Sequence, residues 1–125
     1  MQLVVTPSFA RIDGKKRQLI LDIKVGLQED DLVTIDGFVA DEFELAVRVT
    51  GPDGELQPAT IHKLSLKALK ENRSRAIQEG LATQLQIPAE MNGFYRISVA
   101  VKSKQTGAIG STNRMIEAVD RNRSN

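Results

Sequence analysis

The sequence contains no cysteine and no tryptophan, one histidine (His62), and only five aromatic rings among its 125 residues. Without cysteine the chain can form no disulfide, no thiolate-ligated zinc or iron–sulfur centre, and no thiol nucleophile. No apolar run approaches the about 20 residues that a membrane-spanning helix requires, so we expect no membrane insertion. The remaining composition, 41% hydrophobic and 26% charged with a formal net charge of +1, is that of one globular domain.

Apolar and polar residues alternate along four segments of the chain. A strand places alternate side chains on opposite faces, so each segment is predicted to be a strand with one buried face. Phe43 and Leu81 begin two of these patterns. The residues predicted to lead the core are Leu21, Ile23, Val25, Leu45, Val47, Val49, Leu85, Ile87, Tyr95, Ile97 and Val99.

Turn-forming residues separate the predicted strands. Gly51-Pro52-Asp53-Gly54 combines the preset φ of proline, an aspartate that can cap its own backbone, and a glycine free to take positive φ. Weaker signals of the same kind stand at Asp13-Gly14, Asn92-Gly93 and Thr106-Gly107. Short strands separated by such turns predict an all-β fold, namely a single antiparallel sandwich of about seven strands over residues 1–125, with an ordered core at about 17–119.

The segment from Leu64 to Gly80 leaves two alternatives open. Leu66, Leu69 and Ile77 stand among good helix formers, and Gly80 can stop a helix, which favours a short helix near residues 65–79. Leu64 and Leu66, however, alternate like a strand, and the weak helix formers in 72–74 would interrupt a helix. On balance these residues favour strand, loop and strand.

Residues 88–99 read P-A-E-M-N-G-F-Y-R-I-S-V, and this stretch resembles the entry to the penultimate strand of immunoglobulin-like and fibronectin-like sandwiches. The resemblance extends to residues 47–55 and 106–111. It implies a tyrosine corner, in which the Tyr95 ring packs in the core and its hydroxyl binds nearby backbone. The combination is similar to β-sandwich modules that accompany von Willebrand factor type A domains and other modules in bacterial surface or periplasmic proteins. It implies structural roles for Tyr95, Gly93, Pro52 and Gly54.

Nine carboxylates against the single Arg48 give residues 29–55 a net charge of −8. Calcium binds six to eight oxygens, which sandwich loops can supply from Asp and Glu. The loop pattern D-x-[DN]-x-[DN]-G does not occur in the sequence, and solvated surface carboxylates are the simpler interpretation. The acidic stretch is therefore the basis of an alternative function rather than a predicted metal site.

Other candidate chemistry is sparse. The basic residues nearest to a nucleic-acid-binding stripe have no aromatic residue among them, so we expect no nucleic-acid partner. His62 and the pair Asp30-Asp31 have no nucleophile motif such as G-x-S-x-G beside them, and the sequence has no glycine-rich phosphate loop. The basic residues considered above for nucleic-acid binding are Lys63, Lys67, Lys70, Arg73 and Arg75, which we call the basic stripe.

We therefore expect a non-enzymatic structural or interaction module, with no catalytic residues, metal or cofactor. The resemblance implies that it belongs to a larger extracytoplasmic protein, periplasmic or on the cell surface, and that loops or an edge strand bind a protein or glycan partner. The alternative is a calcium-dependent adhesin-type domain that uses the acidic stretch 29–55.

Overall fold

A computed structural model describes residues 1–12 and 16–119, and it has the predicted all-β architecture of two antiparallel sheets. The turn predicted at Asp13-Gly14 lies outside these residues. The elements are β1 (Gln2–Ile12), β2 (Lys16–Gly26), a 3-10 turn η1 (Glu29–Asp31), β3 (Thr34–Ile35), β4 (Phe38–Thr50), β5 (Thr60–Leu69), a 3-10 turn η2 (Lys70–Asn72), α1 (Arg73–Glu79), β6 (Leu81–Pro88), β7 (Gly93–Ser103) and β8 (Ile109–Ala118).

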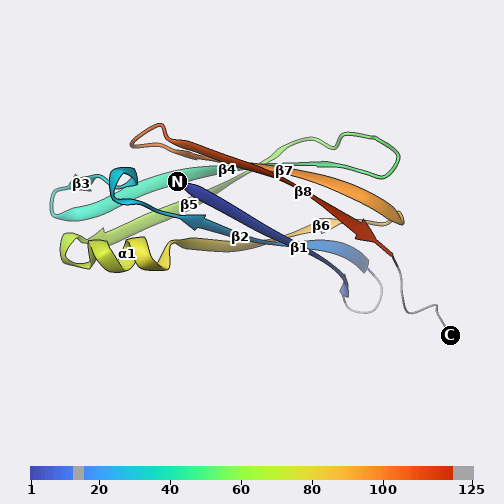
Figure 1. Cartoon of the computed structure of the whole chain (residues 1–125), viewed down its shortest axis with the longest axis horizontal. Coiled ribbons are helices and arrows are strands. Elements are labelled where there is room, and N and C mark those ends of the chain that lie inside the picture. The colour runs from blue at the N-terminus through green and yellow to red at the C-terminus, as the bar shows by residue number, and fades with distance from the viewer. Residues whose placement is uncertain (13–15, 120–125) are drawn as a thin grey trace.

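The first sheet has the strand order β1-β2-β6, and every pairing in it is antiparallel. In the second sheet β4 pairs with β5 on one side and with β7 on the other, and β8 follows β7. The two-residue strand β3 pairs with the start of β4. Figure 1 shows both sheets running along the length of the molecule.

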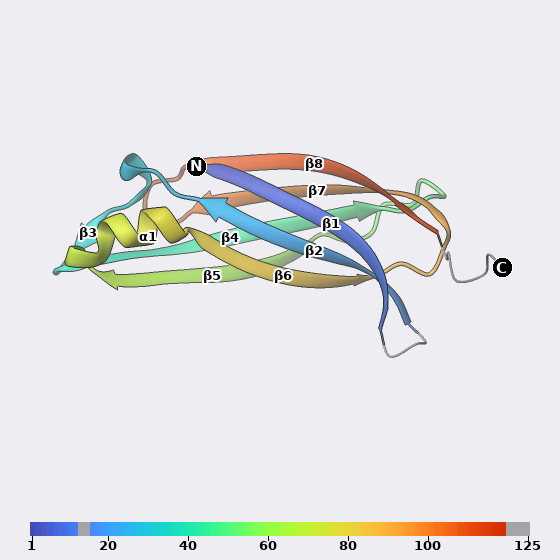
Figure 2. The ribbon, with the colours of Figure 1, turned by 60° about the horizontal axis from the view of Figure 1, so that its bottom comes forward.

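The two sides of the sandwich differ. On one side β1 approaches β8, and the Arg114 Nε donates a hydrogen bond of 3.1 Å to the Val5 carbonyl. On the other side lie the edge strands β5 and β6, joined through η2 and α1 at one end of the molecule (Figure 2). The first side is therefore linked between the sheets, whereas the second leaves two strand edges exposed.

The core between the sheets consists of aliphatic side chains with Phe43 and Tyr95. Of the eleven residues predicted to lead it, nine are buried, while Leu85 and Ile87 on β6 are only partly buried. The alternation therefore predicted the inward face of β2, β4, β6 and β7 correctly. Strand β1 adds Val5 to this core from ahead of the expected range 17–119.

Residues 64–80 combine the two alternatives that the sequence left open. Leu64 and Leu66 do alternate within β5, but the expected loop after the strand is η2 followed by the short helix α1. Residues 72–74, which were expected to interrupt a helix, instead begin one, with Asn72 as its N-cap and Gly80 ending it at a φ of +66°. Asn72 makes no side-chain capping hydrogen bond; instead, the 3-10 turn η2 leads directly into the helical backbone at Arg73, and Ser74 is the second residue of α1. No helix in 1–12 or 16–119 is both long and apolar enough to cross a membrane.

Candidate functional site

The predicted structural residues meet at one end of the sandwich, where the loop 51–59 after β4 faces the loop 89–92 before β7. Gly93 has a φ of +131°, and a Cβ atom added there would lie 2.7 Å from the Pro52 Cβ. Glycine is therefore required at this position both by its backbone conformation and by the close approach of the proline ring. This contact holds the two loops against each other.

Tyr95 connects the core to the same loops. Its ring is buried at 2% exposure on the inward face of β7. Its hydroxyl donates to the Met91 carbonyl at 3.0 Å and accepts from the Met91 N–H at 3.2 Å. This is the geometry of a tyrosine corner, in which one side chain satisfies both backbone groups of a loop residue.

Arg17 on β2 anchors the loop 89–92 from the opposite sheet. Its guanidinium donates to the Glu90 carbonyl at 2.9 Å and to the Asn92 side-chain oxygen, and it lies 5.2 Å from the centroid of the Phe9 ring. The Arg17 carbonyl also accepts the Ala89 N–H at 3.0 Å. The loop is thus held by both sheets, which restricts its motion before any partner binds.

The loop 51–59 begins with the turn that the sequence predicted. Gly54 has a φ of +82°, and its N–H donates to the Gly51 carbonyl at 3.0 Å. The Asp53 carboxylate accepts the Glu55 N–H at 2.9 Å, as expected for an aspartate that caps its own turn. A glycine is needed at 54 because other residues rarely adopt this φ.

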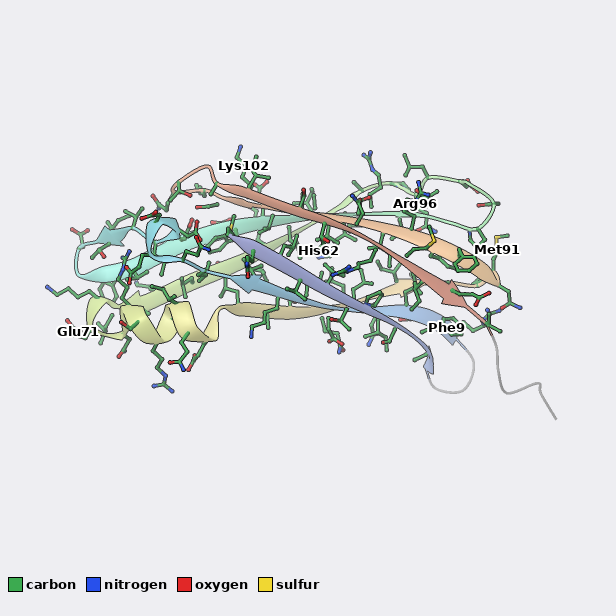
Figure 3. The ribbon with its side chains drawn as sticks, in the orientation of Figure 1. Phe9, His62, Glu71, Met91, Arg96 and Lys102 are labelled. Carbon is green, nitrogen blue, oxygen red and sulfur yellow. The ribbon has the colours of Figure 1, made fainter. Side chains whose placement is uncertain are left out.

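Between the two loops is an open hollow of about 430 Å³, which we call the loop-end hollow. Asp53, Glu55 and Glu90 give it three carboxylates, and Met91 is 48% exposed beside them. Figure 3 places Met91 at this end of the molecule and Glu71 at the other. The hollow is lined by Gly51, Pro52, Asp53, Glu55, Gln57, Pro88, Glu90, Met91 and Tyr95.

The acidic stretch 29–55 is spread over the fold rather than gathered into one site. Within residues 1–12 and 16–119, no three His, Asp or Glu side chains are grouped so that they could hold a metal ion. Asp53 and Glu55 are in the loop-end hollow, whereas Glu29 lies in η1 beside α1, at the other end of the strands. The structure therefore gives no support to a calcium site built from this stretch.

Asp41 is a member of that stretch with a structural function that the sequence analysis missed. Its carboxylate is buried at 6% exposure and accepts hydrogen bonds from the Ser103 hydroxyl and from the N–H groups of Gln105 at 3.1 Å and Glu42 at 2.7 Å. It thereby ties β4 to the turn between β7 and β8. The sequence did contain a sign of this burial: Val39, Asp41 and Phe43 are spaced two residues apart, and in a strand that spacing places all three side chains on the inward face.

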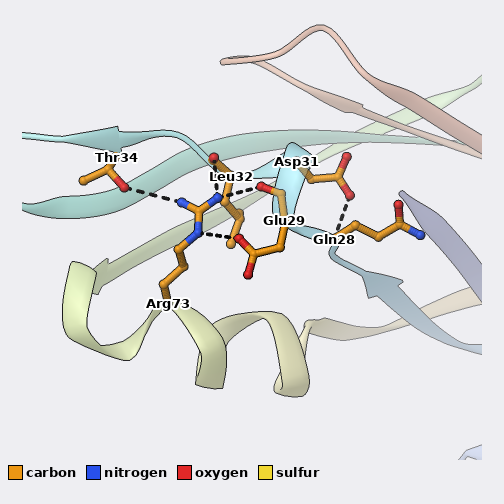
Figure 4. A network of polar contacts seen from close by, with 6 residues as sticks. All are labelled: Gln28, Glu29, Asp31, Leu32, Thr34 and Arg73. Atoms are coloured by element: carbon orange, nitrogen blue, oxygen red, sulfur yellow. Dashed lines mark hydrogen bonds and ion pairs between the residues drawn. The ribbon is translucent and has the colours of Figure 1, made fainter.

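At the opposite end, Arg73 links the first turn of α1 to η1 and β3 (Figure 4). Its Nε donates to the Glu29 carboxylate at 3.0 Å, and its Nη2 donates to the carbonyls of Glu29 and Leu32 at 2.6 and 3.1 Å. The same guanidinium lies 3.4 Å from the Thr34 hydroxyl. One residue of the basic stripe considered for nucleic acid is therefore engaged within the fold.

The other candidates are isolated from one another. His62 Nε2 lies 3.0 Å from the Thr60 hydroxyl on β5. Asp31 is buried and accepts the Gln28 N–H at 2.8 Å, whereas its neighbour Asp30 is exposed. A second open hollow, of about 360 Å³, lies over small residues of β4, β7 and β8 such as Ala46 and Ala100. Neither His62 nor the aspartate pair lines it.

No protein-family model and no curated protein matches the sequence. Among solved structures, a β-glucuronidase of Bacteroides uniformis is similar over 93% of this chain, with a TM-score of 0.56 and 17% identity. The β-glucuronidase 2 of the same organism, covalently bound to cyclophellitol-6-carboxylate aziridine, gives a TM-score of 0.55 at the same identity and coverage. A calcium-binding mutant of that enzyme gives 0.56.

The likeness is one of fold. This chain spans 13% of the length of each of those chains. The β-sandwich implied by the resemblance to immunoglobulin-like modules is thus found in solved structures of larger proteins.

Proposed function

We propose that this chain is a non-catalytic accessory module of a larger extracytoplasmic protein and that it binds a protein or glycan partner. The observation that carries the proposal is the fold likeness: nearly the whole chain corresponds to a segment that makes up 13% of a glycosidase. By fold-level analogy, a sandwich that makes up a small part of a larger enzyme supports a module that positions or binds rather than reacts. The sequence resemblance to modules beside von Willebrand factor type A domains supports the same compartment.

The loop-end hollow is the surface that best fits the binding role. It lies on loops held by Tyr95, Arg17 and the contact between Pro52 and Gly93, so little ordering entropy would be lost on binding. Its carboxylates accept hydrogen bonds, which suits sugar hydroxyls or the cationic side chains of a protein. An anionic sugar such as a glucuronide would meet like charge there, so the substrate class of the similar enzymes is not carried over.

The proposal is tested by amide chemical shifts of the isotope-labelled chain during titration with two probes, the neutral oligosaccharide cellohexaose and an arginine-containing basic peptide. We expect one probe to shift the amide resonances of residues 51–57 and 90–91. The double substitution Met91→Ala and Glu55→Gln should reduce these shifts. The matched control is Gln86→Ala, a change on β6 away from the hollow. Shifts that avoid these loops with both probes would contradict the proposed surface.

The non-catalytic part has its own assay. The chain is incubated with 4-nitrophenyl glycosides, including the β-D-glucuronide, and we expect no nitrophenol above the buffer rate. Turnover that is lost when a side chain of this protein is substituted would overturn the proposal. The compartment is tested by fractionating the native cells, where recovery in the cytoplasm would contradict it.

A further inference from the structure

The edge of β6 differs from that of the other edge strand, β5, in its charge. The register of β2 and β6 ends at the pair Gln18 and Pro88, and one residue further along the Ala89 N–H donates to the Arg17 carbonyl. Antiparallel pairs alternate between bonded and non-bonded residues, so Leu85 and Ile87 bond to β2 while Gln84 and Gln86 direct their backbone groups away from it. The backbone groups of Ala82 also point away from β2. Within the described residues no strand pairs with this side of β6.

Pro88 fits this assignment, because its position, like those of Gln84 and Gln86, is one whose backbone groups point away from β2. A proline is tolerated in a strand where its missing N–H would face away from the sheet. The side chains along this edge carry no charge from Leu81 to Pro88. Leu81, Leu85 and Ile87 face inward but are only partly buried, which leaves apolar surface beside the unpaired backbone.

The edge of β5 is constructed differently. The Lys70 N–H donates to the Gly37 carbonyl at 3.0 Å, so the even-numbered residues of β5 bond to β4. The odd-numbered residues therefore direct their backbone groups away from β4, and among them are Lys63, Ser65 and Lys67. If two β5 strands paired antiparallel about Ser65, Lys63 would stand opposite Lys67 of the second copy. Like charges directly opposite are destabilising, and lysine on an edge is a common protection against pairing.

The remaining edges of the described sheets are also protected. The edge of β1 lies beside β8, where Arg114 binds the Val5 carbonyl, and β3 has only two residues. The strand β6 thus combines eight residues, no charge and an unpaired backbone. Such an edge is a template for another strand.

We propose that β6 pairs antiparallel with β6 of a second copy of this chain, about a two-fold axis at Gln84. In this register Gln84 bonds to Gln84 of the second copy and Ala82 to Gln86, which gives about six backbone hydrogen bonds between the copies. The same register places Thr83 opposite Leu85 and Leu81 opposite Ile87 on the inward face. Pairing thus adds burial to Leu81, Leu85 and Ile87, which the monomer leaves partly exposed.

This inference goes beyond the proposed function, since it concerns backbone pairing over residues 82–86 of β6, whereas the loop-end hollow touches β6 only at Pro88. It is tested by sedimentation equilibrium of the whole chain over roughly a hundredfold range of concentration. We expect the mass to rise from that of the monomer to twice that value and to stop there. A chain that stays monomeric, or a mass that continues to rise, overturns the two-fold pairing.

The decisive variant is Gln84→Pro, with Ser65→Pro on the β5 edge as the matched control. Both prolines replace an N–H that bonds to no strand of the monomer, and Gln84→Pro removes in addition only an exposed hydrogen bond from the Gln84 side chain to the Asp22 carboxylate. Both chains should therefore melt near the wild-type temperature when dilute. We expect Gln84→Pro to raise the dimer Kd about tenfold or more, and Ser65→Pro to leave it unchanged. Equal loss in both variants, or dimerisation that Gln84→Pro leaves intact, overturns the proposal.

A second readout needs no substitution. Amide hydrogen exchange at Ala82, Gln84 and Gln86 should slow as the concentration of the wild-type chain rises, while that at Lys63, Ser65 and Lys67 should not. Exchange at the β6 amides that does not depend on concentration contradicts the pairing. Met91→Ala, which tests the loop-end hollow, should leave the dimer Kd unchanged, so failure of one proposal is separable from failure of the other.

Discussion

Strands β2 and β6 lie side by side and carry the same alternation of apolar and polar residues, yet they bury their apolar side chains to different depths. Leu21 on β2 is fully buried, whereas Leu85, its direct partner on β6, is only partly buried. The strand β2 has a neighbour on each side, and β6 has one. The comparison shows that alternation determines which face of a strand is inward, while the depth of burial depends on the position of the strand in its sheet.

The largest loss of stability is expected on β4, a central strand of the second sheet. Val47→Asp places an unpaired carboxylate between the sheets, at a residue of 2% exposure on β4, and should cost about 4 kcal/mol or more or unfold the chain. Thermal melting followed by circular dichroism measures it. The control is Arg48→Asp, one residue along on the exposed face, which should change the melting temperature little. Similar melting of the two variants would break the assignment of faces.

The comparison of β2 with β6 is tested by truncating its two facing leucines. Leu21→Ala should cost about 3 to 4 kcal/mol, and Leu85→Ala about 1 to 2, because the exposed site loses less burial and leaves a smaller cavity. Urea denaturation gives both free energies of unfolding at dilute concentration. If both variants lost the same free energy of unfolding, Leu85 would be as deeply buried in the monomer as Leu21, which contradicts the edge position of β6.

Asp41 tests whether an inward polar residue acts as part of the core. Asp41→Ala removes the acceptor for the Ser103 hydroxyl and for two backbone N–H groups, and the unfolding free energy should fall by about 2 to 3 kcal/mol. Asp41→Asn, which keeps one carbonyl oxygen, should lose less. If alanine is tolerated without loss, water reaches these donors and the residue is not part of the buried network.

The smallest expected effect is at the tyrosine corner. Tyr95→Phe keeps the ring in the core but removes the bonds to the Met91 N–H and carbonyl, which should cost about 1 kcal/mol. Tyr95→Ala should cost about 3 kcal/mol or more, since it also removes the ring. A urea titration of both variants separates the hydroxyl from the ring, and identical losses would contradict the two-part role assigned to Tyr95.

The sequence predicted the features that depend on neighbouring residues. The inward residues of β2, β4 and β7 follow from period two, and the turn at Gly54 follows from local backbone preference. Whether a strand is central or at an edge depends on pairing between distant segments, such as β2 with β6. For that reason the partial exposure of Leu85 and Ile87 and the anchoring of the loop 89–92 by Arg17 were not predicted.

The acidic stretch illustrates the same limit. Its charge total suggested one site, but folding placed Glu29 beside Arg73, Asp41 in the core and Asp53 in a turn. The helix α1 lies within residues 65–79, where the sequence left a short helix open although it favoured strand, loop and strand.

Residue-by-residue hydrogen exchange of the monomeric chain shows whether β2 is an interior strand and β6 an edge strand of one sheet. We expect unbroken protection of the β2 amides from Leu19 to Val25. In β6 we expect slow exchange at Thr83, Leu85 and Ile87 alternating with fast exchange at Ala82, Gln84 and Gln86. Uniform protection along both strands, or none in β6, would contradict this assignment.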